Sequence, residues 1–506
     1  MGTSRGERPN VVLFITDQWR AKDTGYWGNN VIRTPHIDSL AREGAGFKWC
    51  FVQNPVSTPS RASMATGWYC HVCGHRTMHH MLRRHEPNLL RYFKDAGYYV
   101  WWGGKNDMIS QEAIPESCHV RVHGTGGKPT VHKSPWKQRD RLFHTFLWGE
   151  VPGNFGPSLA DDYVAEQAAK FLETPTSEPF LMLVNQTYPH PPYAVSEPYF
   201  SMYDRSKVPS PIMPPKDFKG KPQVLKLVHK RMRMDEMTED DLQEIVAVYY
   251  GMITKTDRNF GWILEALKEH GHWDNTIVVA TSDHGDFVGD YLLTEKTQNT
   301  FEDVLVNVPF TIRVPGCDPL PSLSEALIEW IDLLPTLAEA CDITLGHTQF
   351  GRSLLPIILG EASQHRKYVF SEGGALKTEV HTHETDRPRE NIYWARVALQ
   401  ITNPEAHGKA VMIRSKKWKF VQRLYDTDEL YDLKNDSNEL NNLIDEPSVA
   451  SVRDELASIM LNWFIETGDQ VPWRWDLRNP NEAHPPWSIA AVKHGFAQVR
   501  SINRSK

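Results

Sequence analysis

Cysteine is scarce in this sequence, and long apolar runs are missing. Six cysteines stand among 506 residues, too few for a disulfide framework in a chain of this length, which agrees with a reducing compartment. The apolar run after the polar first nine residues, Val11 to Ile15, is far too short for a signal peptide or a membrane span. We therefore expect a soluble cytoplasmic protein with no membrane partner. A secreted or periplasmic protein whose leader has been removed would show the same pattern.

A strong charge of either sign is also absent. The 56 basic and 63 acidic residues give a net charge of −7. Such mild acidity argues against a nucleic-acid partner, although it does not exclude a local basic pocket. There is no internal repeat, and the 40% hydrophobic and 24% charged residues are typical of a globular protein. At this length we expect one large domain and a smaller one.

Four short apolar runs have the character of strands buried on both faces of a mostly parallel sheet. They are residues 10–15, 98–102, 180–185 and 276–281. Open α/β sheets bind ligands at the carboxyl ends of their strands. The polar segments that follow the runs are therefore the first candidates for a site, and they contain Asp17, Lys105, His190, Asp283 and His284.

Asp17, Asp283 and His284 are candidate metal ligands. A single acidic residue at a strand end can equally cap a turn, but oxygen-rich ligands from several strand ends suit a hard divalent cation such as Ca²⁺ or Mg²⁺. The sequence leaves open whether His284 binds the metal or hydrogen-bonds the nucleophile. His190 lies among three prolines, which suits proton transfer to a leaving group, with a structural histidine as the alternative.

The stretch from Pro55 to Gly67 has the features of a nucleophile site. Pro59 fits the first turn of a helix that Gly67 ends. Ser57 would then lie at the helix N-terminus, where free N–H groups favour an anion, and Arg61 adds a positive charge one turn on. A plain helix cap is the simpler interpretation of Ser57.

The spacing Ser57-x-Pro59-Ser60-Arg61, with Thr66-Gly67 behind it, resembles the sulfatase motif, (Cys or Ser)-x-Pro-(Ser or Ala)-Arg followed by a small-residue helix that ends in Thr-Gly. The remaining anchors of the resemblance stand in the family's order: Asp17, Lys105, His190, Asp283-His284 and Lys296. The chain thus resembles the formylglycine-dependent sulfatases of the alkaline-phosphatase superfamily.

The resemblance implies an α/β fold with two parts. Residues 1–360 would form a catalytic domain whose large, mostly parallel sheet is sandwiched by helices. Residues 361–506 would form a smaller domain with an antiparallel sheet, a helix and an aromatic tail. The finer predictions are a loop over 194–237, a helix over 327–337, strands near 366–371, 392–401, 409–414 and 417–423, and a helix over 449–467.

The resemblance also implies a reaction and a set of roles. In sulfatases the Cys or Ser, here Ser57, is oxidised after translation to formylglycine (3-oxoalanine), whose hydrated aldehyde attacks sulfur. The resemblance therefore implies a formylglycine-generating maturation enzyme as a partner. The implied cofactor is Ca²⁺, with Mg²⁺ or Mn²⁺ as options. Its implied ligands are Asp17, Gln18, Ser57, Asp283 and His284. The implied catalytic residues are Ser57, Arg61, Lys105, His190, His284 and Lys296.

Two positions depart from the common sulfatase pattern. Gln18 stands where a second Asp is usual, and together with Asp283-His284 it is similar to choline sulfatases and phosphonate monoester hydrolases. Asp107 replaces the family's histidine after Lys105, and it either orients Lys105 or contacts a cationic or hydroxyl-rich substrate. His75 and Arg76, in a polar segment, are further tentative substrate contacts.

Three functions remain open from the sequence. The leading one is hydrolysis of a small-molecule or oligosaccharide sulfate ester, with carbohydrate sulfates first because of family habit. The second is hydrolysis of a phosphate or phosphonate ester by unmodified Ser57, and the third is a sulfated-glycan binding protein without turnover. Serine at position 57 fits either a Ser-type enzyme or a Cys-type protein altered to trap substrate. A homo-oligomer is a further option.

Overall fold

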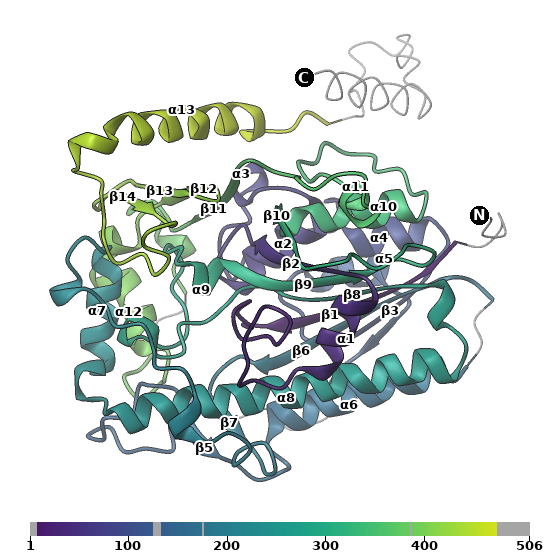
Figure 1. The fold of residues 1–506 in the computed structure, drawn as a ribbon, viewed down its shortest axis with the longest axis horizontal. Helices are drawn as coiled ribbons and strands as arrows, with labels where there is room; N and C mark the ends of the chain where they lie inside the picture. Colours follow the sequence, from purple (N-terminus) through teal and green to yellow (C-terminus); the bar gives the residue numbers. More distant parts are fainter. Residues whose placement is uncertain (1–7, 125–132, 175–176, 385–386, 473–506) are drawn as a thin grey trace.

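Eight strands form a large central sheet (Figure 1). The computed structural model describes residues 8–124, 133–174, 177–384 and 387–472. The strands lie in the order β10-β2-β9-β8-β1-β6-β3-β4. Their bounds are β1 (Asn10–Asp17), β2 (Ala45–Phe51), β3 (Tyr99–Gly104), β4 (Val120–Val122), β6 (Phe180–Pro189), β8 (Thr276–Ser282), β9 (Asn307–Arg313) and β10 (Ser324–Glu329). Strand β9 runs antiparallel to both neighbours, and every other pair in this sheet is parallel. The predicted mostly parallel α/β fold is confirmed.

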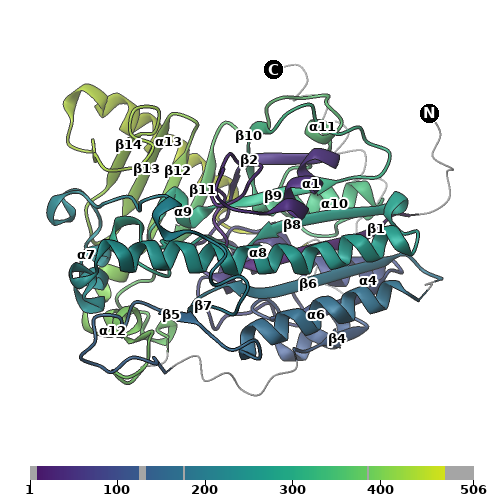
Figure 2. The ribbon, with the colours of Figure 1, turned by 60° about the horizontal axis from the view of Figure 1, so that its bottom comes forward.

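Helices cover both faces of this sheet (Figures 1 and 2). One face packs against α1 (Pro35–Glu43), α6 (Gly156–Leu172) and α8 (Glu239–Glu269), and the other against α2 (Ser57–Thr66), α4 (Leu89–Asp95) and α10 (Leu333–Ala340). The long helix α8 begins with a capping box, in which Thr238 and Asp241 each accept a hydrogen bond from the other's backbone N–H. The strands are therefore buried on both sides, as their continuous apolar sequences require.

Shorter elements connect these layers. The short helices are α3 (Cys70–Cys73), α5 (Ile114–Ser117), α7 (Gln223–Met232), α9 (Asp303–Val306) and α11 (Leu355–Ile358), and the strands β5 (Leu147–Glu150) and β7 (Tyr193–Val195) form a separate pair. Among the helices in the described parts of the chain, none is long and apolar enough to cross a membrane.

A second, antiparallel sheet lies towards the C-terminal end of the chain. Its strands are β11 (Val369–Gly373), β12 (Ala410–Arg414), β13 (Trp418–Arg423) and β14 (Glu429–Asp432), in that order. Helix α13 (Ala450–Thr467) packs on this sheet (Figure 1) through Leu456, Met460 and Trp463. The predicted antiparallel sheet and its helix are thus present. The division at residue 360 stays a prediction, and the predicted aromatic tail lies outside the described residues.

Three finer predictions are wrong. Residues 392–401, predicted as a strand, lie in α12 (Trp394–Thr402) and its approach, because a short apolar run fits a buried strand and a buried helix equally well. The α-helix predicted over 327–337 starts later, with α10, because residues 327–329 complete strand β10. The predicted loop over 194–237 contains α7, whose apolar residues at positions 224, 225, 228 and 232 are buried at helical spacing.

Candidate active site

The four central strands bring the candidate residues to one edge of the sheet. Strands β8, β1, β6 and β3 are neighbours and run parallel, so their carboxyl ends meet at the same edge. Asp17 ends β1, Lys105 follows β3, His190 follows β6 and Asp283 follows β8. The convergence expected from the four apolar runs is therefore present in the structure.

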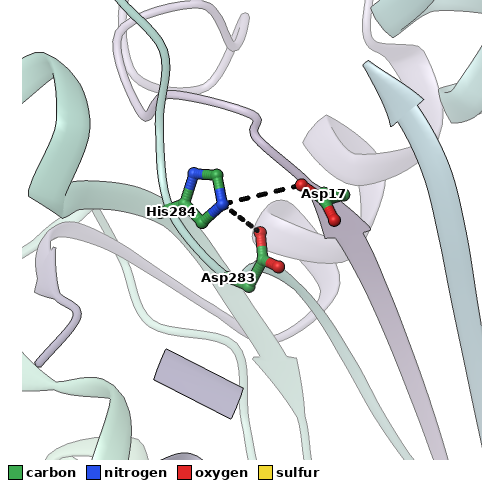
Figure 3. A group of neighbouring side chains, drawn as sticks. All are labelled: Asp17, Asp283 and His284. Atoms are coloured by element: carbon green, nitrogen blue, oxygen red, sulfur yellow. Dashed lines mark ion pairs between the residues drawn. The ribbon is translucent and has the colours of Figure 1, made fainter. Parts of the chain in front are cut away.

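Asp17, Asp283 and His284 form a buried cluster (Figure 3). Their ligand atoms lie within 4.8 Å of one another, with His284 Nε2 3.6 Å from Asp17 Oδ1 and 3.7 Å from Asp283 Oδ1. His284 Nδ1 donates to the carbonyl of Gly285 at 2.9 Å, which leaves the lone pair on Nε2 facing the carboxylates. Burial lowers the pKa of His284, which favours this neutral form. Two carboxylates and a neutral imidazole fit a divalent cation.

Basic side chains compensate the buried carboxylates. Arg61 Nε donates to Asp283 Oδ2 at 2.7 Å, and Arg61 is itself 1% exposed. Burial alone would raise the pKa of Asp17, but Lys105 and the other basic groups around it hold that pKa well below its usual value. Both carboxylates are therefore tied to a neighbouring cation, so the cluster is stable as an anionic site.

Ser57 lies beside this cluster as the first residue of helix α2. Its Oγ is 3.0 Å from His284 Nε2 and 3.3 Å from Asp17 Oδ2. The N-terminal N–H groups of the helix add positive potential at this point. A nucleophile at position 57 thus has a base, a carboxylate and a helix N-terminus around it.

Lys105 contacts two carboxylates. Its ammonium forms an ion pair with Asp17 and a second one, of 2.8 Å, with Asp107. Gly104, just before it, has φ +86, and a Cβ there would meet the carbonyl oxygen of Asn185 at 1.8 Å, so only glycine allows this close approach of β3 to β6. Burial lowers the pKa of Lys105, but the carboxylates of Asp107 and Asp17 outweigh this and raise it. Asp107 therefore contacts Lys105, one of the two roles expected for it.

The charge of Asp107 is expected to select among anionic esters. Replacing it in Asp107→Asn should raise the ratio of aryl phosphate to aryl sulfate kcat/KM by about 3- to 30-fold, because a dianionic phosphate feels the removed charge more strongly than a monoanionic sulfate. Steady-state kinetics on 4-nitrophenyl phosphate and 4-nitrophenyl sulfate measure the ratio. The Asp107→Glu variant keeps the charge and serves as the control. An unchanged ratio in Asp107→Asn, or an equal rise in Asp107→Glu, contradicts the prediction.

His190 and Lys296 form a second pair of candidate catalytic groups. His190 Nδ1 donates to the carbonyl of Pro191 at 2.7 Å, so Nε2 is free to accept from Lys296 Nζ at 3.2 Å. Burial and the charge of Lys296 lower the pKa of His190 well below its usual value. Lys296 Nζ also donates to Glu295 Oε1 and Gln18 Oε1, both at 2.7 Å.

Gln18 is oriented from both ends of its amide. Its Nε2 donates to Asp286 Oδ2 at 2.7 Å, while its Oε1 accepts from Lys296. Its backbone N–H donates to Asp283 Oδ1 at 3.1 Å, which places the residue next to the carboxylate cluster. The predicted role of Gln18 as a metal ligand stays a prediction.

A cavity of about 480 Å³ opens at this site, within the usual size range of small-molecule sites. Lys105, His190 and Lys296 line it. Its other charged or phenolic lining residues are not among the predicted site residues: Asp161, Tyr188, Glu295, Glu384, Arg387, Tyr393 and Arg396. Glu295 could have been found as the neighbour of Lys296, but the residues from 384 onward carry no motif and lie far away in sequence.

His75 and Arg76 are not among the residues that line this cavity. His75 Nε2 is 3.2 Å from Glu86, and Arg76 forms an ion pair with Glu379 at 2.7 Å. The role of these two residues in substrate binding stays a prediction. Their own partners give them a structural setting.

Known proteins share this chain's sequence and fold. The Sulfatase family model matches residues 9–343. The "Uncharacterized sulfatase YidJ" of Escherichia coli (strain K12) is 26% identical over 510 residues, which cover 95% of this chain and 92% of the relative. The "N-acetylglucosamine-6-O-sulfatase" of Bacteroides thetaiotaomicron is 23% identical over 514 residues, which cover 90% and 86%.

Solved structures agree on the fold. The phosphonate monoester hydrolase of Agrobacterium radiobacter superposes with a TM-score of 0.75 at 22% identity, and the match covers 94% of this chain and all of that one. This likeness shows an alkaline-phosphatase-like fold. Because the family model spans well over half of the chain, the chain belongs to the sulfatase family and is a sulfuric ester hydrolase.

Proposed function

We propose that this protein hydrolyses a sulfate monoester of a carbohydrate to an alcohol and inorganic sulfate, with a formylglycine formed from Ser57. The observation that carries the proposal is the position of Ser57 Oγ, 3.0 Å from His284 Nε2 and 3.3 Å from Asp17 Oδ2. Sulfated sugars are supported by relatives such as the N-acetylglucosamine-6-O-sulfatase. The formylglycine would supply a geminal diol, in which one hydroxyl attacks sulfur and the other later allows sulfate to be expelled.

The basic side chains around Ser57 would bind and neutralise the sulfuryl group. Lys105 and Lys296 line the cavity, and Arg61 is held by Asp283 beside the nucleophile. Fixed cations in a site shielded from water stabilise the negative charge that shifts onto oxygen as the S–O bond breaks. A group of this kind contributes about 10²- to 10³-fold to kcat when it is well placed.

His190 would deliver the proton to the departing alcohol. Its Nε2 is the ring nitrogen that contacts Lys296 Nζ, so a proton at this atom has an ammonium donor 3.2 Å away. Lys296 would thereby supply His190 with a proton, although burial disfavours the charged form of His190. His284 Nε2, which has a free lone pair, would accept the proton of the attacking hydroxyl at position 57.

Asp17 and Asp283 would hold a divalent cation, which leaves the Nε2 lone pair of His284 for the proton, and we propose Ca²⁺ because carboxylate oxygens favour a hard ion. Such an ion supplies Lewis-acid polarisation of the oxygen at position 57. The role of the chain is to present these ligands already buried and oriented, with Arg61 fixing Asp283 and Lys105 fixing Asp17.

Removal of divalent ions is expected to lower stability as well as turnover. Ca²⁺ at a hundredfold excess over its Kd should raise the free energy of unfolding by about 2.7 kcal/mol over the EDTA-treated protein. Thermal unfolding with EDTA, and after addition of Ca²⁺, Mg²⁺ or Mn²⁺ singly, measures this shift. The shift should vanish in Asp283→Asn and persist in Asp107→Asn. A Tm that no ion changes, or a shift retained in Asp283→Asn, counts against the site.

A second function is favoured by one contact. The hydroxyl of unmodified Ser57 can donate directly to His284 Nε2, the arrangement of an activated serine nucleophile. Ser57 would then attack a phosphate or phosphonate ester without prior oxidation.

Mass spectrometry of the peptide that contains residue 57, taken from protein made in its native host, separates these two functions. A loss of two hydrogens at Ser57 is expected for the sulfatase. An unmodified serine, with turnover of phosphonate esters and none of sulfate esters, would overturn the proposal in favour of the second function.

A further inference from the structure

The cavity at the active site extends to residues from the last third of the described chain. Glu384, Arg387, Tyr393 and Arg396 line it together with Lys105, His190 and Lys296. Tyr393 and Arg396 belong to helix α12 and its start. A ligand bound through its ester group to Lys105 and Lys296 therefore has room to reach these residues.

Most charged groups that line this cavity have a partner within the protein. Lys105 pairs with Asp17 and Asp107. Lys296 pairs with Glu295 at 2.7 Å. Each of these lysines is therefore already paired with a carboxylate before any ligand binds.

The other acidic residues of the cavity are also satisfied. Arg396 pairs with Glu384 and with Glu295 at 3.3 Å. Although burial would raise it, Arg396 lowers the pKa of Glu384 to about 2, so this carboxylate is ionised and its charge is used. Asp161 accepts the backbone N–H groups of Thr187 and Tyr188 at 2.8 Å each.

Arg387 is the exception. Within the described part of the chain, its guanidinium forms no ion pair or hydrogen bond, and its Nε is a buried donor without a partner. A buried N–H group without an acceptor loses its hydrogen bonds to water and gains none in return, so native proteins rarely retain one. A charged donor that lines a ligand cavity and has no acceptor among the described residues is explained by an acceptor on the ligand.

We propose that Arg387 binds a second anionic group, a carboxylate or a sulfate, on the alcohol part of the substrate. The inference rests on the proposed function for the first anionic group, the sulfate ester near Ser57. Planar guanidinium groups bind both kinds of oxyanion through paired N–H donors. The cavity also has apolar walls from Phe155, Pro157 and Pro192, against which a sugar ring can pack between its two charges. The substrate class is thus a polyanionic sugar.

Binding to matched ligand pairs tests this assignment. Titration calorimetry is carried out on the full chain in a Ser57→Ala background, which prevents turnover. The first pair is glucosamine 6-O-sulfate and glucosamine 2-N,6-O-disulfate. The second is a 6-O-sulfated uronic-acid disaccharide and its methyl ester, in which the carboxylate is neutral. The first pair reports a sulfate at the Arg387 subsite, and the second reports a carboxylate.

In the parent protein we expect the second anionic group to tighten binding by about 10- to 100-fold in at least one pair, as a charged hydrogen bond does. Arg387→Ala should lose this preference, and Arg387→Lys should keep only part of it, because a lysine is a single point charge. Arg389→Ala is the matched control: Arg389 is exposed, lies two residues away and is absent from the cavity lining. It should keep the whole preference.

The inference is overturned if the parent binds both members of each pair equally, if Arg387→Ala keeps the preference, or if Arg389→Ala loses as much as Arg387→Ala. Thermal unfolding of each variant shows that a lost preference is not lost folding. Assays of 4-nitrophenyl sulfate with intact Ser57 separate this result from the proposed function. If the protein turns over 4-nitrophenyl sulfate but shows no preference for a second anionic group, only the inference about Arg387 fails. If the preference depends on Arg387 but no sulfate ester is turned over, only the proposed function fails.

Discussion

Replacing Ser57 with alanine is expected to lower kcat for 4-nitrophenyl sulfate by at least about 10⁴-fold, because the change removes the nucleophile under either proposed mechanism. Ser57 Oγ is the hydroxyl that contacts both His284 and Asp17. The cations of the site remain in Ser57→Ala, so ligand binding should survive while turnover is lost. Steady-state kinetics and calorimetry with a sulfated sugar measure the two effects separately.

Ser63→Ala is the matched control for this change. Ser63 lies on the same helix and is equally buried, but its Oγ contacts Cys70 Sγ at 3.4 Å rather than the carboxylate cluster. Its kcat should stay within about threefold of the parent, since a single buried hydroxyl costs mainly stability. A comparable loss of kcat in both variants would show that helix α2 tolerates no change. Substantial turnover by Ser57→Ala would show that residue 57 is not the nucleophile.

Replacing Arg366 with methionine is expected to lower the free energy of unfolding by about 3–5 kcal/mol, because two buried carboxylates lose their cation. Arg366 pairs with Glu329 at 2.8 Å and with Asp332, and Arg366 itself lies just before strand β11. Leu327 of strand β10 pairs with Arg366 in an isolated bridge. The guanidinium therefore ties the large sheet to the small one.

The loss should also depend on pH in a defined direction. Burial would raise the pKa of Asp332, but Arg366 and His365 hold it below its usual value. A depressed carboxyl pKa contributes stability above the unfolded-state value of about 3.8, and this part is lost as the pH falls below it. The difference between Arg366→Met and the parent should therefore shrink in acid.

Urea unfolding at pH 7 and at about pH 3, which is below the unfolded-state value, measures both expectations for Arg366. Lys367→Met is the control, because Lys367 is the next residue but is exposed, and its free energy of unfolding should stay close to that of the parent. If the free energy of unfolding of Arg366→Met lies within about 1 kcal/mol of the parent value, the contact between the two sheets does not depend on this ion pair.

The local sequence is sufficient to predict a helix or strand where one short stretch contains all the residues that identify it. The continuous apolar run of β1 and the Pro59-to-Gly67 helix were predictable because burial on both faces and a proline-started helix leave few alternatives. Strand β2 is covered by no prediction, since Ala45-Gly46-Phe47-Lys48-Trp49 mixes small, charged and aromatic residues. Helix α12 stands where the sequence predicts a strand, because its apolar run is too short to show a period.

The sequence by itself indicated four strands with Asp17, Lys105, His190 and Asp283 at their carboxyl ends, and with them a charged site at one sheet edge. Only the tertiary structure decided which further charges reach that site. The contact of Glu295 with Arg396 joins residues that no local pattern relates. The same holds for the position of Arg387 in this cavity, where its Nε has no partner among the described residues. The physical reason is that charge compensation depends on distance in space, whereas motifs record only spacing along the chain.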